Sequence, residues 1–115
     1  MKKEIYTFQS TPFALGGIQR SIKTTVEEFE VVKIGIYTCL FVKNTQKNLW
    51  HCAEADCGAI IGTNKSKTKL LKQVRGGIES GDPEIMKKQV EQGKIDCSNA
   101  SMMEQDIFFS HFRES

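Results

Sequence analysis

The chain has 115 residues, of which 39% are hydrophobic and 26% are charged, and its net charge is +2. This length and composition are typical of one globular domain with a packed core, and they exclude a disordered or fibrous chain. No apolar run approaches the roughly 18 residues that a membrane-spanning helix needs. The N-terminal MKKEIYTFQ has two lysines but no apolar stretch after them, so we expect no export signal and a cytoplasmic protein.

Charge is distributed unevenly along the chain. Residues 1–75 carry 12 basic and 6 acidic side chains, whereas residues 76–115 carry 4 basic and 8 acidic side chains. This division is typical of steered contact with a charged partner, and it is also found on ordinary solvated surfaces.

The first two-thirds of the chain predict β-strands. Residues 6–17, YTFQSTPFALGG, alternate loosely between apolar and polar side chains and end in Gly16-Gly17, which indicates a strand and a turn. Residues 21–32 are rich in β-branched side chains, which favours a strand, although Thr25 and Glu28 also fit a helical capping box. The mostly apolar run GIYTCLFV at 35–42 predicts a central strand.

A hairpin is expected next. Residues 49–55, LWHCAEA, predict a strand in which Trp50, Cys52 and Glu54 face one side while the residues between them face the other. The Asp-Cys-Gly sequence at 56–58 predicts a turn, because Asp and Gly tolerate the positive φ of tight hairpins. AIIG at 59–62 is then the returning strand.

The next stretch predicts a helix that begins near Ser66 or Thr68, since either hydroxyl suits the cap position. Its apolar side chains fall on one arc at the helical period; they are Leu70, Leu71, Val74 and Ile78. Gly81 is expected to end this helix.

Two further helices are expected after this one. Asp82 suits the cap of the second helix and Pro83 its first position, and we expect the helix to stop at Gly93. Its apolar face is thin. Ser101 and Glu104 then fit a capping box for a third helix.

This order of elements predicts the fold class. Strands come first and helices after, which is typical of an α+β fold. We expect one domain over residues 1–115, with an antiparallel sheet of about four strands in the N-terminal two-thirds. Two or three C-terminal helices would pack on it.

The four cysteines predict reduced, partly buried thiols. Cys52 and Cys57 have four residues between them, which is at the edge of zinc-ligand spacing, and Cys97, His51 or His111 would have to complete the site. Strong zinc motifs have a second closely spaced pair, which this chain lacks. We therefore expect no metal and no cofactor.

Basic residues without any acid among them follow the hairpin. They are Lys65, Lys67, Lys69, Lys72 and Arg75. Lysines at a helix start lie near free backbone N–H groups, and both attract phosphate. GTNKSKTKLLKQV at 62–74 resembles the last strand-to-helix turn of double-stranded-RNA-binding domains, and this resemblance implies phosphate contacts by Lys65, Lys67 and Lys69.

GIY at 35–37 and IIG at 60–62 resemble the two sequence elements of the GIY-YIG nucleases. The resemblance implies that Tyr37 is the first catalytic tyrosine and that Glu91 or Glu104 holds the metal. Ile60 stands where that family has its second tyrosine.

The C-terminal SMMEQDIFFSHF is more apolar than one helix face can use. Its large apolar side chains are Met102, Met103, Ile107, Phe108, Phe109 and Phe112. Helical geometry places Met102, Ile107 and Phe109 on a different side from the other three, so we expect one set to pack on the sheet. The other set would form a homodimer or protein-partner interface with Glu104 and Asp106 on its rim.

We expect a non-catalytic binding protein, because the sequence gives no combination of nucleophile, base and oxyanion donors. It would regulate or inhibit a protein partner, as small accessory proteins of phages and mobile elements often do. The alternatives are a nucleic-acid-binding domain that uses residues 65–75 and a GIY-YIG-like nuclease.

Overall fold

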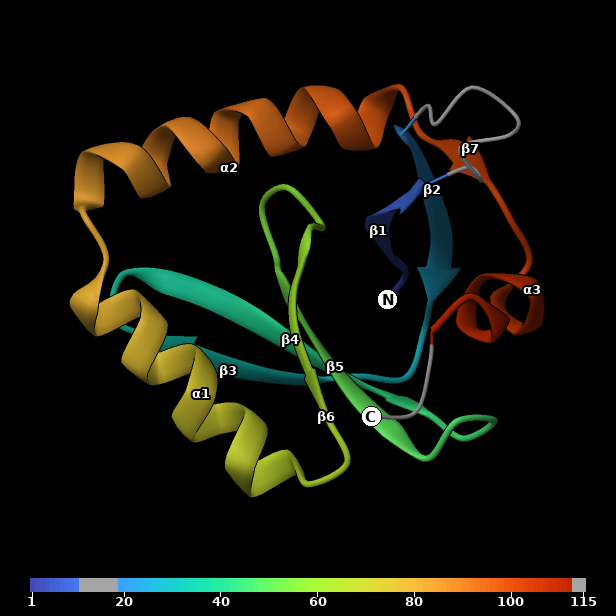
Figure 1. The fold of residues 1–115 in the computed structure, drawn as a ribbon, viewed down its shortest axis with the longest axis horizontal. Helices are drawn as coiled ribbons and strands as arrows, with labels where there is room; N and C mark the ends of the chain where they lie inside the picture. Colours follow the sequence, from blue (N-terminus) through green and yellow to red (C-terminus); the bar gives the residue numbers. More distant parts are fainter. Residues whose placement is uncertain (11–18, 113–115) are drawn as a thin grey trace.

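A computed structural model describes residues 1–10 and 19–112, and Figure 1 shows its elements. The described part of the chain begins with the strands β1 (Lys3–Ser10), β2 (Gln19–Val26), β3 (Glu30–Ile34), β4 (Tyr37–Asn44), β5 (Leu49–Glu54) and β6 (Ile60–Asn64). These strands are followed by the helices α1 (Lys67–Ser80) and α2 (Pro83–Ser98). The short strand β7 (Ser101–Met102) and helix α3 (Gln105–Ser110) follow. The predicted α+β class is therefore confirmed. The turn expected at residues 16 and 17 lies outside the described residues.

The strands form two sheets. Strands β3, β4, β5 and β6 form an antiparallel sheet in that order, which matches the expected four strands. The second sheet has the order β1-β2-β7, with β1 antiparallel and β7 parallel to β2. Residues 27–29 separate β2 from β3. The segment 21–32, for which the sequence predicted one strand or a helix, therefore contributes to two strands in different sheets.

The four-stranded sheet is the middle layer of the molecule. On one face, Cys39, Phe41 and Cys52 pack against Leu70 and Val74 of α1. On the other face, alternate residues of the same strands pack against the three-stranded sheet and α3. Strand β4 has buried side chains on both faces because it is covered on both, as its continuous apolar run predicts. The predicted division of β5 into two faces is also confirmed.

Helix α1 begins and ends as predicted. The Ser66 hydroxyl accepts a hydrogen bond from the N–H of Lys69 at 3.3 Å, and Gly81 is the C-cap. Asp82 then caps α2 by accepting from the N–H of Glu84 at 2.9 Å, and Pro83 occupies the first turn of α2.

Helix α2 does not stop at Gly93, so this prediction is wrong. Gly93 is buried where α2 crosses β1, and a Cβ at this position would lie 2.9 Å from Cys57 Sγ and 3.1 Å from Tyr6 Oη. Glycine permits this close approach of helix and strand, and the helix continues to Ser98. The glycine that we interpreted from the sequence as a helix end is therefore required for the packing of α2 on β1.

The capping box at Ser101 is also absent. Ser101 and Met102 instead pair in parallel with Ile22 and Lys23 of β2, and the Met103 N–H donates to the Lys23 carbonyl at 2.8 Å. Helix α3 therefore starts at Gln105, with Glu104 at its N-cap and no side-chain cap bond. None of the helices in the described ranges is long and apolar enough to cross a lipid bilayer.

Candidate functional site

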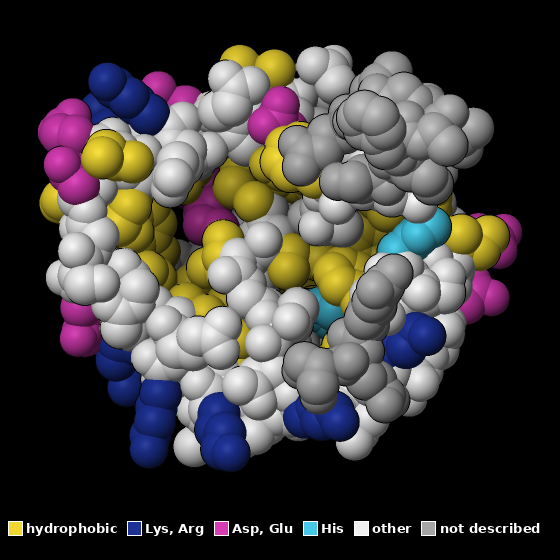
Figure 2. All heavy atoms as spheres, viewed as in Figure 1, with side chains coloured by type: hydrophobic (Ala, Val, Ile, Leu, Met, Phe, Trp, Pro, Cys, Tyr) yellow, Lys and Arg dark blue, Asp and Glu magenta, His cyan; other side chains and the backbone are white. Residues whose placement is uncertain are grey.

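A mainly apolar hollow lies between α1 and α2, above the ends of β4, β5 and β6. It has an inner cavity of about 100 Å³ and a wider outer part of about 360 Å³. The two parts share Ile61, Ile78, Met86 and Gln89, so they lie next to each other, and together we term them the α1–α2 groove. Figure 2 shows the hollow, with hydrophobic side chains around it and an acidic side chain in its depth.

Helix α2 forms one wall of the groove because its apolar face is only partly covered. Ile85, Met86 and Val90 face the groove, whereas the buried residues of α2, Gly93 and Cys97, lie further along the helix. Ile85 remains 55% exposed. The first half of α2 therefore presents an apolar surface that no other described part of the chain buries completely.

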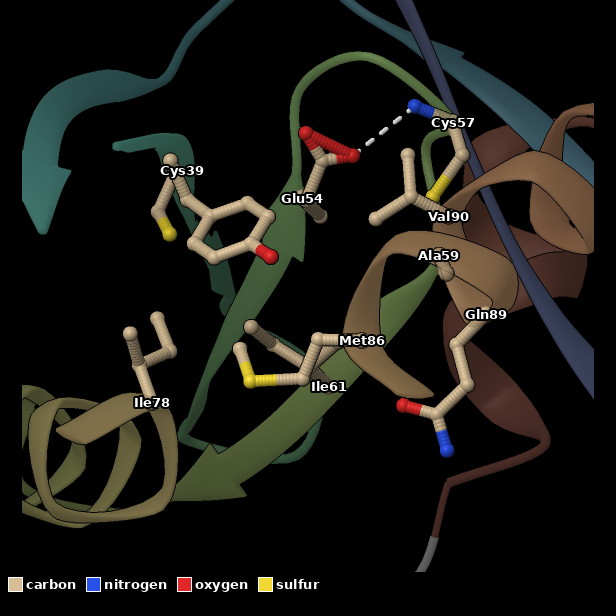
Figure 3. A pocket seen from close by; sticks show the side chains of 10 residues that line it. Cys39, Glu54, Cys57, Ala59, Ile61, Ile78, Met86, Gln89 and Val90 are labelled. Carbon is tan, nitrogen blue, oxygen red and sulfur yellow. Dashed lines mark hydrogen bonds between the residues drawn. The ribbon is translucent and has the colours of Figure 1, made fainter. Parts of the chain in front are cut away.

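Helix α1 and the sheet form the rest of the groove. Ile78 extends from α1, and Ile61 rises from β6 with 45% of its surface exposed. In Figure 3, Met86 extends toward Ile78 across Ile61. Methionine is a flexible side chain that adapts to differently shaped apolar surfaces.

Glu54 supplies a carboxylate to the inner cavity, but this carboxylate already has partners. Its oxygens accept hydrogen bonds from the Asp56 N–H at 2.9 and 3.1 Å and from the Cys57 N–H at 3.0 Å (Figure 3). Only 4% of the residue is exposed. Glu54 therefore stabilises the β5–β6 turn, where Gly58 has a positive φ of 80°.

The four cysteines are free thiols and all are buried. Burial raises the pKa of Cys57 to about 12 and also raises the pKa of Cys97. The hydrogen bond with Cys39 raises the pKa of Cys52, and burial raises it further. Since the thiolate is the reactive form of cysteine, Cys52, Cys57 and Cys97 are poor nucleophiles at neutral pH. Among residues 1–10 and 19–112, no three His, Cys, Asp or Glu side chains are grouped to hold a metal ion.

The residues implied by the nuclease resemblance lie apart. Tyr37 is at the start of β4 and lines the inner cavity, while Ile60 packs against the core on the other side of the sheet. Glu91 is exposed on α2, and Glu104 is exposed at the start of α3. The structure does not bring these side chains together as one site.

The predicted basic residues lie along the start of α1. Lys65, Lys69, Lys72 and Arg75 are exposed, whereas Lys67 forms an ion pair with Glu30 and lies over the ring of Trp50. The strand-to-helix turn is therefore present where the sequence predicted it.

The predicted partner-binding residues of the C-terminal segment divide into two groups. Phe108 and Phe109 are both buried in the core, and Met103 and Phe112 are partly buried against it. Met102 and Ile107 remain about half exposed, and Glu104 and Asp106 are exposed beside them in the sequence. The predicted separation of Phe109 from Phe108 is wrong, because both rings are buried in the same core cluster.

The groove could not be predicted from any single stretch of the sequence. Its lining comes from β4, β5, β6, α1 and α2, and no short motif joins these segments. The thin apolar face of α2 was the available signal, because apolar residues that are too few for a core face still require a partner.

Comparison of the chain with protein-family models, with curated proteins and with solved structures gave no significant match.

Proposed function

We propose that this protein is a non-catalytic binding protein that holds an amphipathic helix of a protein partner in the α1–α2 groove. The observation that carries the proposal is the uncovered apolar face of α2 opposite Ile78 and Ile61. Binding of a helix between two helices is a recurring mode of protein recognition, in which apolar anchors enter a hydrophobic groove.

The chemistry of the groove supports binding rather than catalysis. Its buried carboxylate, Glu54, already accepts hydrogen bonds from two backbone N–H groups, those of Asp56 and Cys57. The thiols that line it, Cys39 and Cys57, are buried. The remaining lining is mainly aliphatic, with Gln73 and Gln89 available as polar contacts at the edge.

The charges at the outer end of the groove indicate the character of the partner. Asp82 lines the outer part, and Glu79 and Glu84 are exposed next to it in the α1–α2 turn. An apolar helix face flanked by Lys or Arg would complement this end of the groove.

The proposal is tested by recovering partners from the native host with tagged wild-type protein and with Ile61→Glu and Ile85→Glu variants. Full burial of an isoleucine contributes about 1.5–3 kcal/mol, so each variant should lower the affinity for the recovered partner about ten- to hundredfold. Ile95→Glu is the matched control, because Ile95 is equally exposed on α2 but does not line the groove.

Affinities of the purified partner for each variant, measured by calorimetry, decide the outcome. Loss of binding in the two groove variants with retention in the control supports the proposal. A partner that binds the groove variants normally would place the interface elsewhere.

A further inference from the structure

A second surface of the molecule lies at the end of the sheet opposite the α1–α2 turn. Register pairs Lys43 with Trp50 and Trp50 with Asn64, so the end of β4, the start of β5 and the end of β6 lie side by side. Helix α1 begins three residues after Asn64, which brings its first lysines to the same place. We term this surface the basic edge, and it comprises Lys43, Lys65, Lys67, Lys69, Lys72 and Arg75. Figure 2 shows Lys and Arg side chains spread along the lower edge of the molecule.

Most of these charges have no acidic partner within the described residues. Lys67 is the exception, because it pairs with Glu30. Lys43 donates a hydrogen bond to Asn48 Oδ1 at 3.0 Å and lies 5.4 Å from the centre of the Trp50 ring. Glu28 and Asp106 line one hollow together with Lys43, and no basic residue of α1 lines it. The first turn of α1 contains no acidic residue, so the positive end of the helix dipole adds to the field.

The basic edge has the form of a line. Lys69, Lys72 and Arg75 follow one another at three-residue spacing along α1, and Lys65 lies just before the Ser66 cap of the helix. At a rise of 1.5 Å per residue, Lys69 to Arg75 span about 9 Å of α1, and Lys65 lengthens the row beyond the start of the helix. The four basic side chains can thus meet about four phosphates along one strand of a duplex. A single row of charges on a convex helix surface matches a linear polyanion better than a flat membrane surface.

We propose that the basic edge binds the phosphate backbone of nucleic acid without reading its sequence. Lys65, Lys69, Lys72 and Arg75 contact successive phosphates, while Lys43 and Lys67 extend the positive surface across Trp50. This inference is independent of the groove, which lies between α1 and α2 and has acidic side chains at its outer end.

The test measures binding of fluorescently labelled duplex and single-stranded oligonucleotides by anisotropy over a series of salt concentrations. About four phosphate contacts predict that log K falls with log salt with a slope of about −3.6 for duplex and about −2.8 for single strands. The variant Lys65→Glu/Lys69→Glu/Lys72→Glu should lower the affinity at least about tenfold and flatten the slope. Lys67 is left unchanged because its charge is already paired with Glu30.

The matched control is Lys87→Glu/Lys88→Glu/Lys94→Glu, which changes the net charge equally through exposed lysines of α2. Circular dichroism establishes that both triple variants remain folded. The inference is supported if only the basic-edge variant loses binding. It is overturned if both triple variants lose affinity equally, or if the wild type binds no oligonucleotide at the lowest salt concentration. It is also overturned if the lysines bind phosphatidylserine vesicles and not nucleic acid.

Discussion

His51 is buried between β5 and the aromatic side chains of the C-terminal segment. Its ring stacks on Phe109 with 5.4 Å between centres and meets Phe112 edge-on at 4.3 Å. The Asn44 side-chain amide donates one hydrogen to His51 Nε2 at 3.2 Å and the other to the Phe109 carbonyl at 3.1 Å. This arrangement requires the neutral tautomer with hydrogen on Nδ1, and Nδ1 has no partner among the described residues.

The buried imidazole predicts loss of stability in mild acid. Burial lowers the pKa of His51 to about 4 from an ordinary value of 6.5. Between these two values the unfolded chain binds a proton that the folded protein does not, so the free energy of unfolding decreases as pH falls from 6.5 to 4. The expected loss is about 3 kcal/mol, at about 1.4 kcal/mol for each unit of pKa difference.

Urea unfolding at several pH values between 7 and 4 measures this loss. His51→Phe keeps the stacking on Phe109 and removes the titrating group, so its stability should depend less on pH than that of the wild type. His111→Gln, which changes the other histidine, should retain the wild-type dependence because His111 is exposed. An equal pH dependence in His51→Phe would contradict this account.

The sequence predicted on which face of β5 His51 lies but not its role. Alternation along a strand determines the face on which a side chain lies. The partners of that side chain come from Asn44 in the neighbouring strand and from residues more than fifty positions later. Such contacts are fixed by the packing of α3, which the strand pattern does not contain.

Helix α2 depends on a glycine for its contact with β1. Gly93→Ala should destabilise the protein even though alanine favours a helix by about 1 kcal/mol, because its Cβ would lie 2.9 Å from Cys57 Sγ. Gly76→Ala is the matched control, since no atom lies within 4 Å of a Cβ at that position, and it should stabilise α1. Thermal unfolding of the two variants checks the prediction, which fails if both raise the melting temperature.

The C-terminal segment should separate into residues for folding and residues for association. Phe108→Ala is expected to cost about 3–5 kcal/mol, because Phe108 is completely buried. Met102→Ser/Ile107→Ser should leave stability nearly unchanged, because both side chains are half exposed. If this segment forms a homodimer, the double variant should shift the protein to a monomer in sedimentation experiments. A wild type that stays monomeric at high concentration would exclude the homodimer.

The predictions of helix ends were correct where hydrogen bonds between nearby residues determine the end. Ser66, Gly81, Asp82 and Pro83 mark helix ends through backbone hydrogen bonds within a few residues, and the structure has the ends there. The predictions at Gly93 and Ser101 failed because tertiary contacts decide them. Gly93 meets β1, and Ser101 pairs with β2, each about eighty residues away in the sequence.

At the scale of the whole molecule, the sequence predicted the order of elements but not their division into two sheets. Nothing local in residues 27–29 shows that β2 and β3 belong to different sheets. The second sheet is completed by β7, whose two residues lie after both long helices. Strand pairing over such distances depends on the packing of the whole core, and so does the groove that this packing leaves open.

The attachment of α2 at Gly93 has a mechanical consequence. The second half of α2 is fixed to the sheet by Gly93, by Cys97 and by the Ser21 hydroxyl, which donates to the Asp96 carbonyl at 3.1 Å. The first half of α2 contains no buried residue, so the part of the helix that borders the groove is held less firmly than the second half. Amide hydrogens of residues 87–92 should therefore exchange with deuterium faster than those of residues 94–98. Equal exchange rates along α2 would mean that this wall of the groove is rigid. Faster exchange in the first half would mean that the wall can move, so that the groove can adjust its width to a bound helix.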